Sequence, residues 1–334
     1  MIKYIFKRIL LLIPVLFGVS LLVFLVMHVF SSDPTSIILG QHASQEQILA
    51  LRKQLGLDNA LYIQYLDFMK GLIQGNLGDS LITKTSVSKE IFSRFPATIE
   101  LAIVSIIVAS LIGITLGIFS AVKQNSILDY ICMGGSLIGV SMPIFWLGLI
   151  LIVIFSVNLH LLPVSGRATI GIEPTRITGL YLLDSLITGN INSFLDSLKH
   201  MMLPVIALSS YSTAIIARMT RSTMLEVLGQ DYIRTARSKG LIENIVIIRH
   251  GLRNALIPIS TVIGLQLGSL LGGAVLTETV FSWPGIGSYT IDAILKADYP
   301  VVQGAVIIMA IIFVLVNLLV DLLYSYIDPR IKYS

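Results

Sequence analysis

Six long stretches without a charged residue constrain the fold of this chain more than any other feature of its sequence. A helix needs about 20 mostly apolar residues to cross the hydrocarbon core of a bilayer. The six stretches range from 17 to 30 residues, so each is long enough to be considered as a membrane span. They cover residues 9–30, 101–122, 130–159, 201–217, 255–277 and 301–320. Pro143 predicts a kink within the longest of them.

The composition agrees with a protein that lies mostly in lipid. Only 13% of the 334 residues are charged and 55% are hydrophobic, whereas soluble globular domains carry about 25% charged residues. This excludes an ordinary soluble enzyme and a disordered chain. The stretches are apolar on every face, which favours helices over the alternating strands of a barrel. The sequence therefore predicts an all-α polytopic membrane protein with six transmembrane helices. Cys132 is the single cysteine, so no disulfide forms within the chain.

The first stretch resembles a secretory signal peptide in its basic start, with Lys3, Lys7 and Arg8. However, the apolar run is too long, and the Val-Phe-Ser-Ser sequence at its end is a poor cleavage site. We therefore expect a retained first transmembrane helix.

The distribution of Lys and Arg predicts the orientation in the membrane. If the N-terminus is cytoplasmic, the inner segments 1–8, 123–129, 218–253 and 321–334 hold 13 basic residues. The outer segments 160–200 and 278–300 hold 4, once the long segment 31–100 is set aside because long loops translocate regardless of charge. We therefore expect both termini in the cytoplasm. The basic excess reports topology, and it does not indicate nucleic-acid binding.

The long outer segment 31–100 has a pattern of its own. A short amphipathic helix is predicted after residues 44–47, a second helix over 62–73, and a turn over 75–80. The segment is interpreted either as a helical cap or as a docking surface for something delivered from outside. Both interpretations stay open.

The inner segment 218–253 contains seven basic residues. Each would cost about 2.5–3.5 kcal/mol at the centre of a membrane helix, so the segment is not expected to span. Within it we predict a helix of about nine residues, with Asp231 as N-cap and Gly240 in the left-handed position after its end. Arg237 and Lys239 suit the C-terminal end of the helix dipole.

Small residues on this short helix suggest a role. Thr235 and Ala236 are small, and Tyr232 is bulky one turn before Ala236. Such a helix can insert deep into the groove of a partner protein. The alternative is a helix that rests on anionic lipid, and the residues alone leave both open.

Motifs for independent chemistry are missing from the sequence. There is no Gly-Lys dipeptide and hence no P-loop for ATP. The five histidines are widely separated, and neither a His-Glu-x-x-His motif nor a Gly-x-Ser-x-Gly motif is present. We therefore expect a non-enzymatic chain that binds no metal or cofactor.

The segment 231–241 resembles the cytoplasmic coupling motif of ABC importer permeases, in the form found in the peptide and nickel branch. Arg234-Thr235-Ala236 stands where that motif has Glu-Ala-Ala, and Gly240 follows after three residues. The Arg and the distant Ile257-Pro258 pair depart from the general motif, but the peptide branch shows the same departures. Further similar segments, in the same order, are 56–58, 64–66, 75–78, 96–100, 141–146, 162–167, 218–222 and 278–285. Segments 160–200 and 317–324 are most similar to dipeptide permeases.

The resemblance implies the type I ABC importer permease (MetI-like) fold and a role in dipeptide import across the bacterial inner membrane. It implies a second homologous permease, two cytoplasmic ABC ATPases that use ATP and Mg²⁺, and a periplasmic peptide-binding protein as partners. It also implies a set of residues that couple to the ATPases: Asp231, Tyr232, Arg234, Thr235, Ala236, Arg237, Gly240 and Leu241. The translocation path is not assigned, and Ser141, Pro143 and Trp146 are candidates for it.

The predicted organisation follows from these assignments. It comprises an N-terminal transmembrane helix (1–30), a periplasmic helical region (31–97), a five-helix permease domain (98–325) with a coupling loop (226–253), and a cytoplasmic tail (326–334).

Three alternatives remain at this point. The nearest is the same architecture with another cargo: a nickel chelate, glutathione or a longer oligopeptide. A secondary transporter is disfavoured because no inverted repeat or buried charge relay is visible. A membrane-embedded enzyme is disfavoured because the acid–base residues that it needs are missing.

Overall fold

The computed structural model describes residues 2–29, 33–40 and 43–327. Every regular element in these ranges is a helix, and an isolated bridge between Asp79 and Ser86 is the only β-pairing found in them. The predicted all-α fold class is confirmed. Residue 30 at the end of the first predicted span and residues 328–334 of the predicted tail lie outside the described residues.

The chain forms two compact units. The first comprises residues 1–98 and 284–314. Its core is built by Val87, Ile91, Val301 and Ala305, which are at most 1% exposed. Its elements are α1 (Ile2–Val29), α2 (Pro34–Leu39), α3 (Gln45–Gln54), α4 (Leu61–Ile73), the start of α5 (Val87–Val122), α13 (Ile286–Leu295) and the first part of α14 (Tyr299–Ile327).

The helices predicted in the outer segment are present in this first unit. Ser44 caps α3 and forms a reciprocal capping box with Gln47, which explains why the helix begins at residue 45. Helix α4 covers the second predicted helix, and Gly75 and Gly78 adopt positive φ angles in the turn that follows. Local sequence signals were sufficient for these elements.

The second unit comprises residues 99–283 and 315–334, and α9 lies at its centre. Helix α9 packs against α6, α7, α8 and α12. The elements are the rest of α5, α6 (Ile127–Ser141), α7 (Ile144–Leu151), the π-helical η1 (Ile152–Asn158), α8 (Tyr181–Ile187), α9 (Ile191–Leu228), α10 (Asp231–Ser238), α11 (Glu243–Ile245), the π-helical η2 (Val246–Leu252), α12 (Arg253–Val280) and the end of α14.

Two glycines bring α5 and α9 into close contact. A Cβ atom at Gly117 would lie 2.5 Å from Thr220 Cβ and 2.7 Å from the carbonyl oxygen of Ala217. A Cβ at Gly113, one turn earlier, would lie 2.9 Å from Ile216 Cβ. This is the small-xxx-small packing that lets the backbones of membrane helices approach each other.

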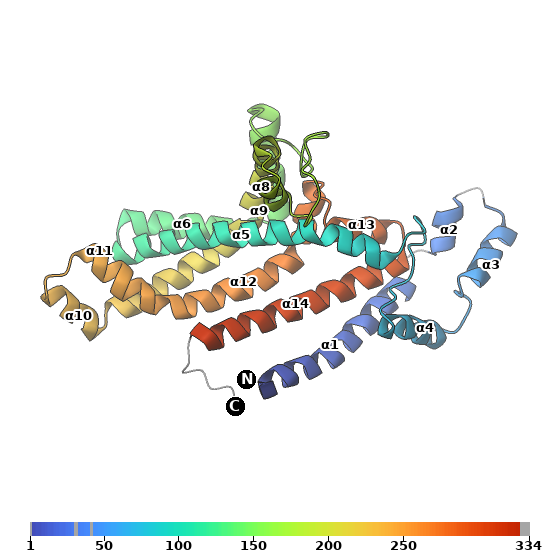
Figure 1. The fold of residues 1–334 in the computed structure, drawn as a ribbon, viewed down its shortest axis with the longest axis horizontal. Helices are drawn as coiled ribbons and strands as arrows, with labels where there is room; N and C mark the ends of the chain where they lie inside the picture. The colour runs from blue at the N-terminus through green and yellow to red at the C-terminus, as the bar shows by residue number, and fades with distance from the viewer. Residues whose placement is uncertain (1, 30–32, 41–42, 328–334) are drawn as a thin grey trace. The chain divides into compact units, whose positions relative to one another are not determined.

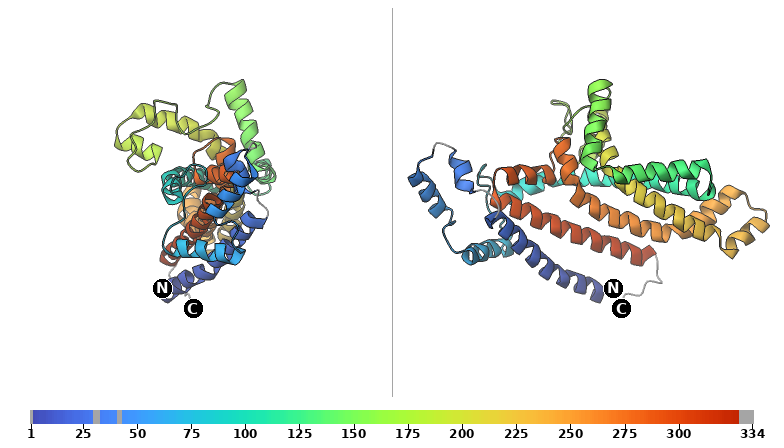
Figure 2. Two further views of the ribbon diagram at one scale, coloured as in Figure 1. Left: turned by 90° about the vertical axis from the view of Figure 1, so that its right-hand side faces the viewer. Right: turned by 180° about the vertical axis from the view of Figure 1, so that it is seen from behind.

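Five of the six predicted spans lie within long apolar helices, namely α1, α5, α9, α12 and α14. The prediction for the stretch 130–159 was partly wrong, because it is not one kinked helix. It is broken into α6 and the α7–η1 arm, which meet at an angle of 103° (Figure 2). The break falls at Met142 and Pro143, where proline cannot donate the backbone hydrogen bond that would continue α6.

The basic segment 218–253 is more helical than expected for a loop. Helix α9 continues through it to Leu228, and η2 leads directly into α12. Lys and Arg are costly in lipid but are good helix formers in water. The basic residues thus mark where the helices leave the predicted membrane region rather than where they end.

Candidate functional site

The predicted coupling helix is present as α10. It lies between α9 and α11, at the end of α9 that is remote from α8 (Figure 1). The prediction of its start was wrong by one residue: Gln230 is the N-cap, and Asp231 is the first residue of an eight-residue helix. Asp231 still interacts favourably with the helix dipole from this position. Gly240 has φ +75°, as predicted for the residue that ends the turn after α10.

One face of α10 packs against the chain itself. Ile233 is fully buried, Ala236 is 7% exposed, and both pack with Val246 of η2 and Leu228 of α9. The structure thus places Ala236 in the packing of α10 against its own chain, and its role in coupling stays a prediction. Ile233 and Ala236 are three residues apart, so they lie on the same face of the helix. The small side chain of Ala236 allows this face to lie close to η2.

An ion pair fixes the other end of the helix. Arg237 donates to both carboxylate oxygens of Glu243, with distances of 2.7 Å from Nη2 and 3.3 Å from Nε. The hydrogen bond to Glu243 also raises the pKa of Arg237. A bidentate pair of this kind adds geometric specificity. It joins the end of α10 to the start of α11, on either side of the turn at Gly240.

The opposite face of α10 is exposed and polar. It is formed by Asp231, Arg234, Thr235 and Ser238, which are all exposed. The Arg234 and Asp231 side chains are 3.5 Å apart, while the hydroxyls of Thr235 and Ser238 hydrogen-bond back to the helix backbone. Tyr232 and Leu241 are 44% and 39% exposed beside this face. The result is a short helix whose exposed side carries charged, hydroxyl and apolar groups.

A second polar cluster joins three helices of the same unit. Arg221 of α9 donates from Nε and Nη2 to the two carboxylate oxygens of Asp129 in α6, at 2.8 and 2.7 Å. Ser120 of α5 and the backbone N–H of Asn125 also donate to Asp129. Asp129 is 2% exposed, so this buried carboxylate is satisfied from α5, α9 and the turn between α5 and α6.

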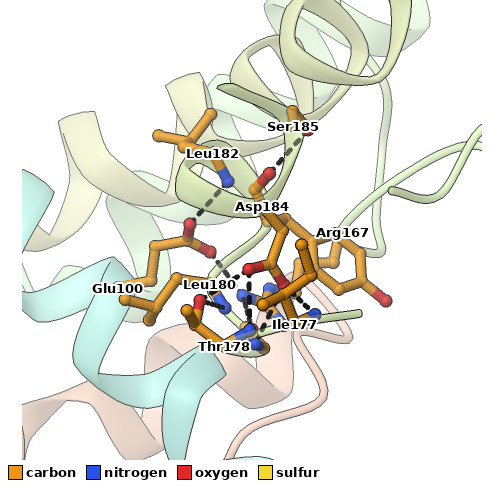
Figure 3. A network of polar contacts seen from close by, with 10 residues as sticks. Glu100, Arg167, Ile177, Thr178, Leu180, Leu182, Asp184 and Ser185 are labelled. Atoms are coloured by element: carbon orange, nitrogen blue, oxygen red, sulfur yellow. Dashed lines mark hydrogen bonds and ion pairs between the residues drawn. The ribbon is translucent and has the colours of Figure 1, made fainter. Parts of the chain in front are cut away.

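A third cluster lies in the predicted outer segment 160–200 (Figure 3). Arg167 Nη2 donates to Glu100 Oε2 at 2.5 Å and to the carbonyl of Gly179 at 2.8 Å. The backbone N–H of Leu182 donates to the other Glu100 oxygen at 2.8 Å. The guanidinium also lies 3.9 Å from the centre of the Tyr181 ring, a cation–π distance. Glu100 of α5 thus holds the segment through a buried ion pair with Arg167 and a hydrogen bond from Leu182.

Asp184 organises the loop next to this ion pair. Its carboxylate accepts hydrogen bonds from the backbone of Ile177, Thr178 and Gly179 and from the Thr178 hydroxyl. Burial by itself would raise the pKa of Asp184, but the hydrogen bonds from these three residues outweigh it and lower the pKa below the ordinary aspartate value. The loop therefore has a fixed shape at neutral pH.

The candidates for the translocation path lie at the break between α6 and α7. Ser141 is the last residue of α6, Pro143 precedes α7, and Trp146 is 45% exposed in the first turn of α7. Ser141 donates to its own helix at Leu137. The three residues are close in sequence and all are exposed, but their assignment to a path stays a prediction.

The sequence analysis did not predict that these charged residues pair with each other in the two buried ion pairs. Asp129 and Arg221 are 92 residues apart, and Glu100 and Arg167 are 67 residues apart. A usable signal was present, since an acid within the first turn of α6 and a base near the end of α9 fall on the same predicted side of the membrane. Within the described residues, no group of three or more His, Cys, Asp or Glu side chains could hold a metal ion.

Comparison with known proteins gives two family matches that together span most of the chain. Residues 113–333 match the family "Binding-protein-dependent transport system inner membrane component". Residues 1–102 match the N-terminal family of the same membrane components.

Individual relatives match along the whole chain. The dipeptide transport system permease protein DppB of Alkalihalophilus pseudofirmus is 52% identical over 333 residues, which is 100% of both chains. The di/tripeptide transport system permease protein DppB of Pseudomonas aeruginosa is 50% identical over 337 residues, again with 100% of both chains covered.

A solved structure shares the fold. It is a chain of the MetNI methionine ABC transporter in inward facing conformations, with a TM-score of 0.53 and 18% identity over 70% of this chain and 93% of the other. With the family matches and the full-length relatives, these findings show that the chain belongs to the binding-protein-dependent transport system inner membrane components, the permease subunits of ABC importers.

Proposed function

We propose that this chain is the permease subunit of an ABC importer that carries dipeptides across the bacterial inner membrane. Support comes from full-length identity of 48–52% to permeases named for dipeptide or di/tripeptide transport in three species. The glutathione permease GsiC of Escherichia coli is 41% identical over the same length, so glutathione is the second candidate cargo. A nickel chelate and a longer oligopeptide are further alternatives within the same architecture.

The proposed assembly contains a second homologous permease, two cytoplasmic ATPases and a periplasmic peptide-binding protein. ATP and Mg²⁺ belong to the ATPases, and this chain contributes no cofactor site of its own. Both termini lie in the cytoplasm, as the Lys and Arg distribution predicts. Lipid is the remaining partner, and nucleic acid is not one.

The observation that carries the coupling role is the two-faced packing of α10. Its apolar face packs on α9 and η2, while Asp231, Arg234 and Thr235 project from the other side. ATP binding closes the ATPase dimer and displaces the helix that sits in its groove. Because α10 packs on α9 and on η2, which continues into α12, and because the Arg237–Glu243 pair ties its end to α11, its displacement moves α9 and α12 rather than bending a loop. Hydrolysis then resets the permease.

The cargo is tested with the assembled importer in proteoliposomes, with the binding protein on the outside and ATP in the lumen. We expect ATP-dependent accumulation of a labelled dipeptide, and competition by unlabelled dipeptides rather than by glutathione. Accumulation that follows a proton gradient without ATP would support a secondary transporter instead. Preferential accumulation of glutathione would reassign the cargo while keeping the architecture.

The coupling role is tested separately on the exposed face of α10. The Arg234→Glu variant should lose co-purification with the ATPases, whereas Arg234→Lys, which keeps the charge, should retain most of it. Equal co-purification of both variants and the unmodified protein would remove the exposed face of α10 from the contact.

A further inference from the structure

Two arginines lie four residues apart where η2 runs into α12. Arg249 belongs to η2, and Arg253 is the first residue of α12. Residues at this spacing are neighbours on the same side of a helix. Both arginines are exposed, and neither forms an ion pair with another residue in the part of the chain that the structure describes. The continuous helix therefore presents two positive charges from one side.

Acidic residues near the two arginines in the sequence are few, and most of them lie beside other cations. Segment 218–253 contains seven basic but only three acidic residues. The Asp231 carboxylate lies 3.5 Å from the guanidinium of Arg234. The Glu243 carboxylate lies 2.7 Å from that of Arg237. Like charges four residues apart repel each other and destabilise a helix. An anion from outside the chain would therefore stabilise the junction of η2 and α12.

The position of the arginines along the helix matches the headgroup layer of a membrane. The uncharged run of α12 begins at Ala255, two residues after Arg253. Because charged side chains are costly in hydrocarbon, the edge of the apolar core is expected beside Arg253. Arg249 lies about 6 Å further out, at 1.5 Å per helical residue, and the headgroup layer is about 5–8 Å thick on each side of the core. Both guanidinium groups therefore reach the layer that holds lipid phosphates.

Apolar side chains lie next to the arginines on the side of the apolar run. Leu256 and Ile257 come three and four residues after Arg253, so they lie on the same side of α12 as its guanidinium. Both are exposed. A soluble anion would use the two arginines alone, whereas an anion that carries acyl chains would also cover Leu256 and Ile257. This combination of charge and apolar surface favours a lipid.

We propose that Arg249 and Arg253 bind the phosphate of an anionic phospholipid, with an acyl chain against Leu256 and Ile257. Each guanidinium can donate two parallel hydrogen bonds to phosphate oxygens, which is the geometry that arginine offers to this group. A lipid with net negative charge is preferred to a zwitterionic one, because an ammonium group in the head would be repelled by the same arginines. The site takes a lipid and is independent of the identity of the cargo.

Native mass spectrometry of the assembled importer tests the proposal. The complex is released from nanodiscs that contain equal amounts of phosphatidylglycerol and phosphatidylcholine, and the retained lipids are counted. We expect preferential retention of phosphatidylglycerol at one site, reduced about fivefold in Arg249→Gln or Arg253→Gln and about thirtyfold in the double variant. Lys123→Gln is the matched control, because Lys123 is an exposed cation in the turn between α5 and α6 that forms no ion pair among the described residues. This variant should keep the lipid.

Several outcomes would overturn the proposal. Equal retention of the two lipids by the unmodified importer would contradict the charge argument. An equal loss in Lys123→Gln and in the arginine variants would show a general attraction of basic residues to the membrane rather than a site. Unchanged lipid retention in the double variant, together with lost co-purification of the ATPases, would assign the arginines to a protein partner. Both arginines are exposed, so their replacement by glutamine should not prevent folding, and each single variant keeps the test decisive if the double variant fails to assemble.

Discussion

Arg221 in α9 binds both carboxylate oxygens of Asp129 in α6, with its Nε and Nη2 atoms at 2.8 and 2.7 Å. Leu228, which packs against α10, is seven residues further along the same helix. Two turns of α9 thus separate α10, the proposed coupling helix, from the ion pair that joins α6 to α9. The pair is therefore one of the contacts that join α6 to the end of α9 beside α10.

Removing one partner of this pair should destabilise the permease. Asp129→Ala leaves Arg221 without its buried counter-charge, and we expect the free energy of unfolding to fall by about 3 kcal/mol. Arg221→Lys keeps the charge but loses the bidentate geometry, so a smaller loss of about 1 kcal/mol is expected. The measurement is the thermal unfolding of the purified chain. Arg218→Lys, at an exposed position on the same helix, is the control, and an equal shift in both lysine variants would contradict the role of the pair.

The contact between α5 and α9 at Gly117 should not tolerate a larger residue. In Gly117→Ala the new methyl group would lie 2.5 Å from Thr220 Cβ and 2.7 Å from a backbone oxygen, so the helices must separate. We expect a loss of about 1–3 kcal/mol in the free energy of unfolding. Gly135→Ala in α6 has no atom within 4 Å of the added methyl, and it should be neutral or slightly stabilising. Similar unfolding midpoints for the two variants would disprove the close packing.

The turn after α10 should be essential for transport but not for membrane insertion. Gly240→Pro forces φ from +75° to about −65°, and Ala236→Arg places a charge in the contact with η2. We expect both variants to insert and to lose ATP-driven uptake in proteoliposomes. Gly229→Ala is the control, because Gly229 at the other end of the connection has φ −81°, which alanine adopts freely. Full uptake by Gly240→Pro or Ala236→Arg would refute the coupling role.

The loop that Asp184 organises should loosen in acid. Because the pKa of Asp184 is lower in the folded protein than in the unfolded chain, its stabilising effect is present at neutral pH and is lost as the pH falls below about 4. Hydrogen exchange at the Ile177 and Gly179 amides, corrected for intrinsic rates, should rise over that range. In Asp184→Asn these amides should exchange quickly at every pH, while Glu173→Gln on the exposed part of the loop should behave like the unmodified protein. Unchanged protection in Asp184→Asn would exclude the carboxylate as the organising group.

Local signals in the sequence predicted the elements that depend on neighbouring residues. The amphipathic pattern after residues 44–47, the turn glycine Gly240 and five apolar runs all act within one or two helical turns, and the structure confirms each of them. The capping box of Ser44 and Gln47 is a further local signal that was not used. The Gly113-x-x-x-Gly117 spacing was also readable as a close-packing motif, although it was not used. Capping and charge signals located α10, and the resemblance of 231–241 to a known motif suggested its role.

The sequence by itself determined that the chain crosses a membrane repeatedly, because the transfer free energy of an apolar run depends only on its composition and length. Tertiary structure decided which side of α10 faces its own chain, how sharply the backbone turns at Pro143, and which distant charges meet, as with Glu100 and Arg167. These features depend on packing between segments far apart in the sequence. A buried charge needs a partner, but the partner's identity is fixed only when the folded helices bring two side chains within hydrogen-bond distance.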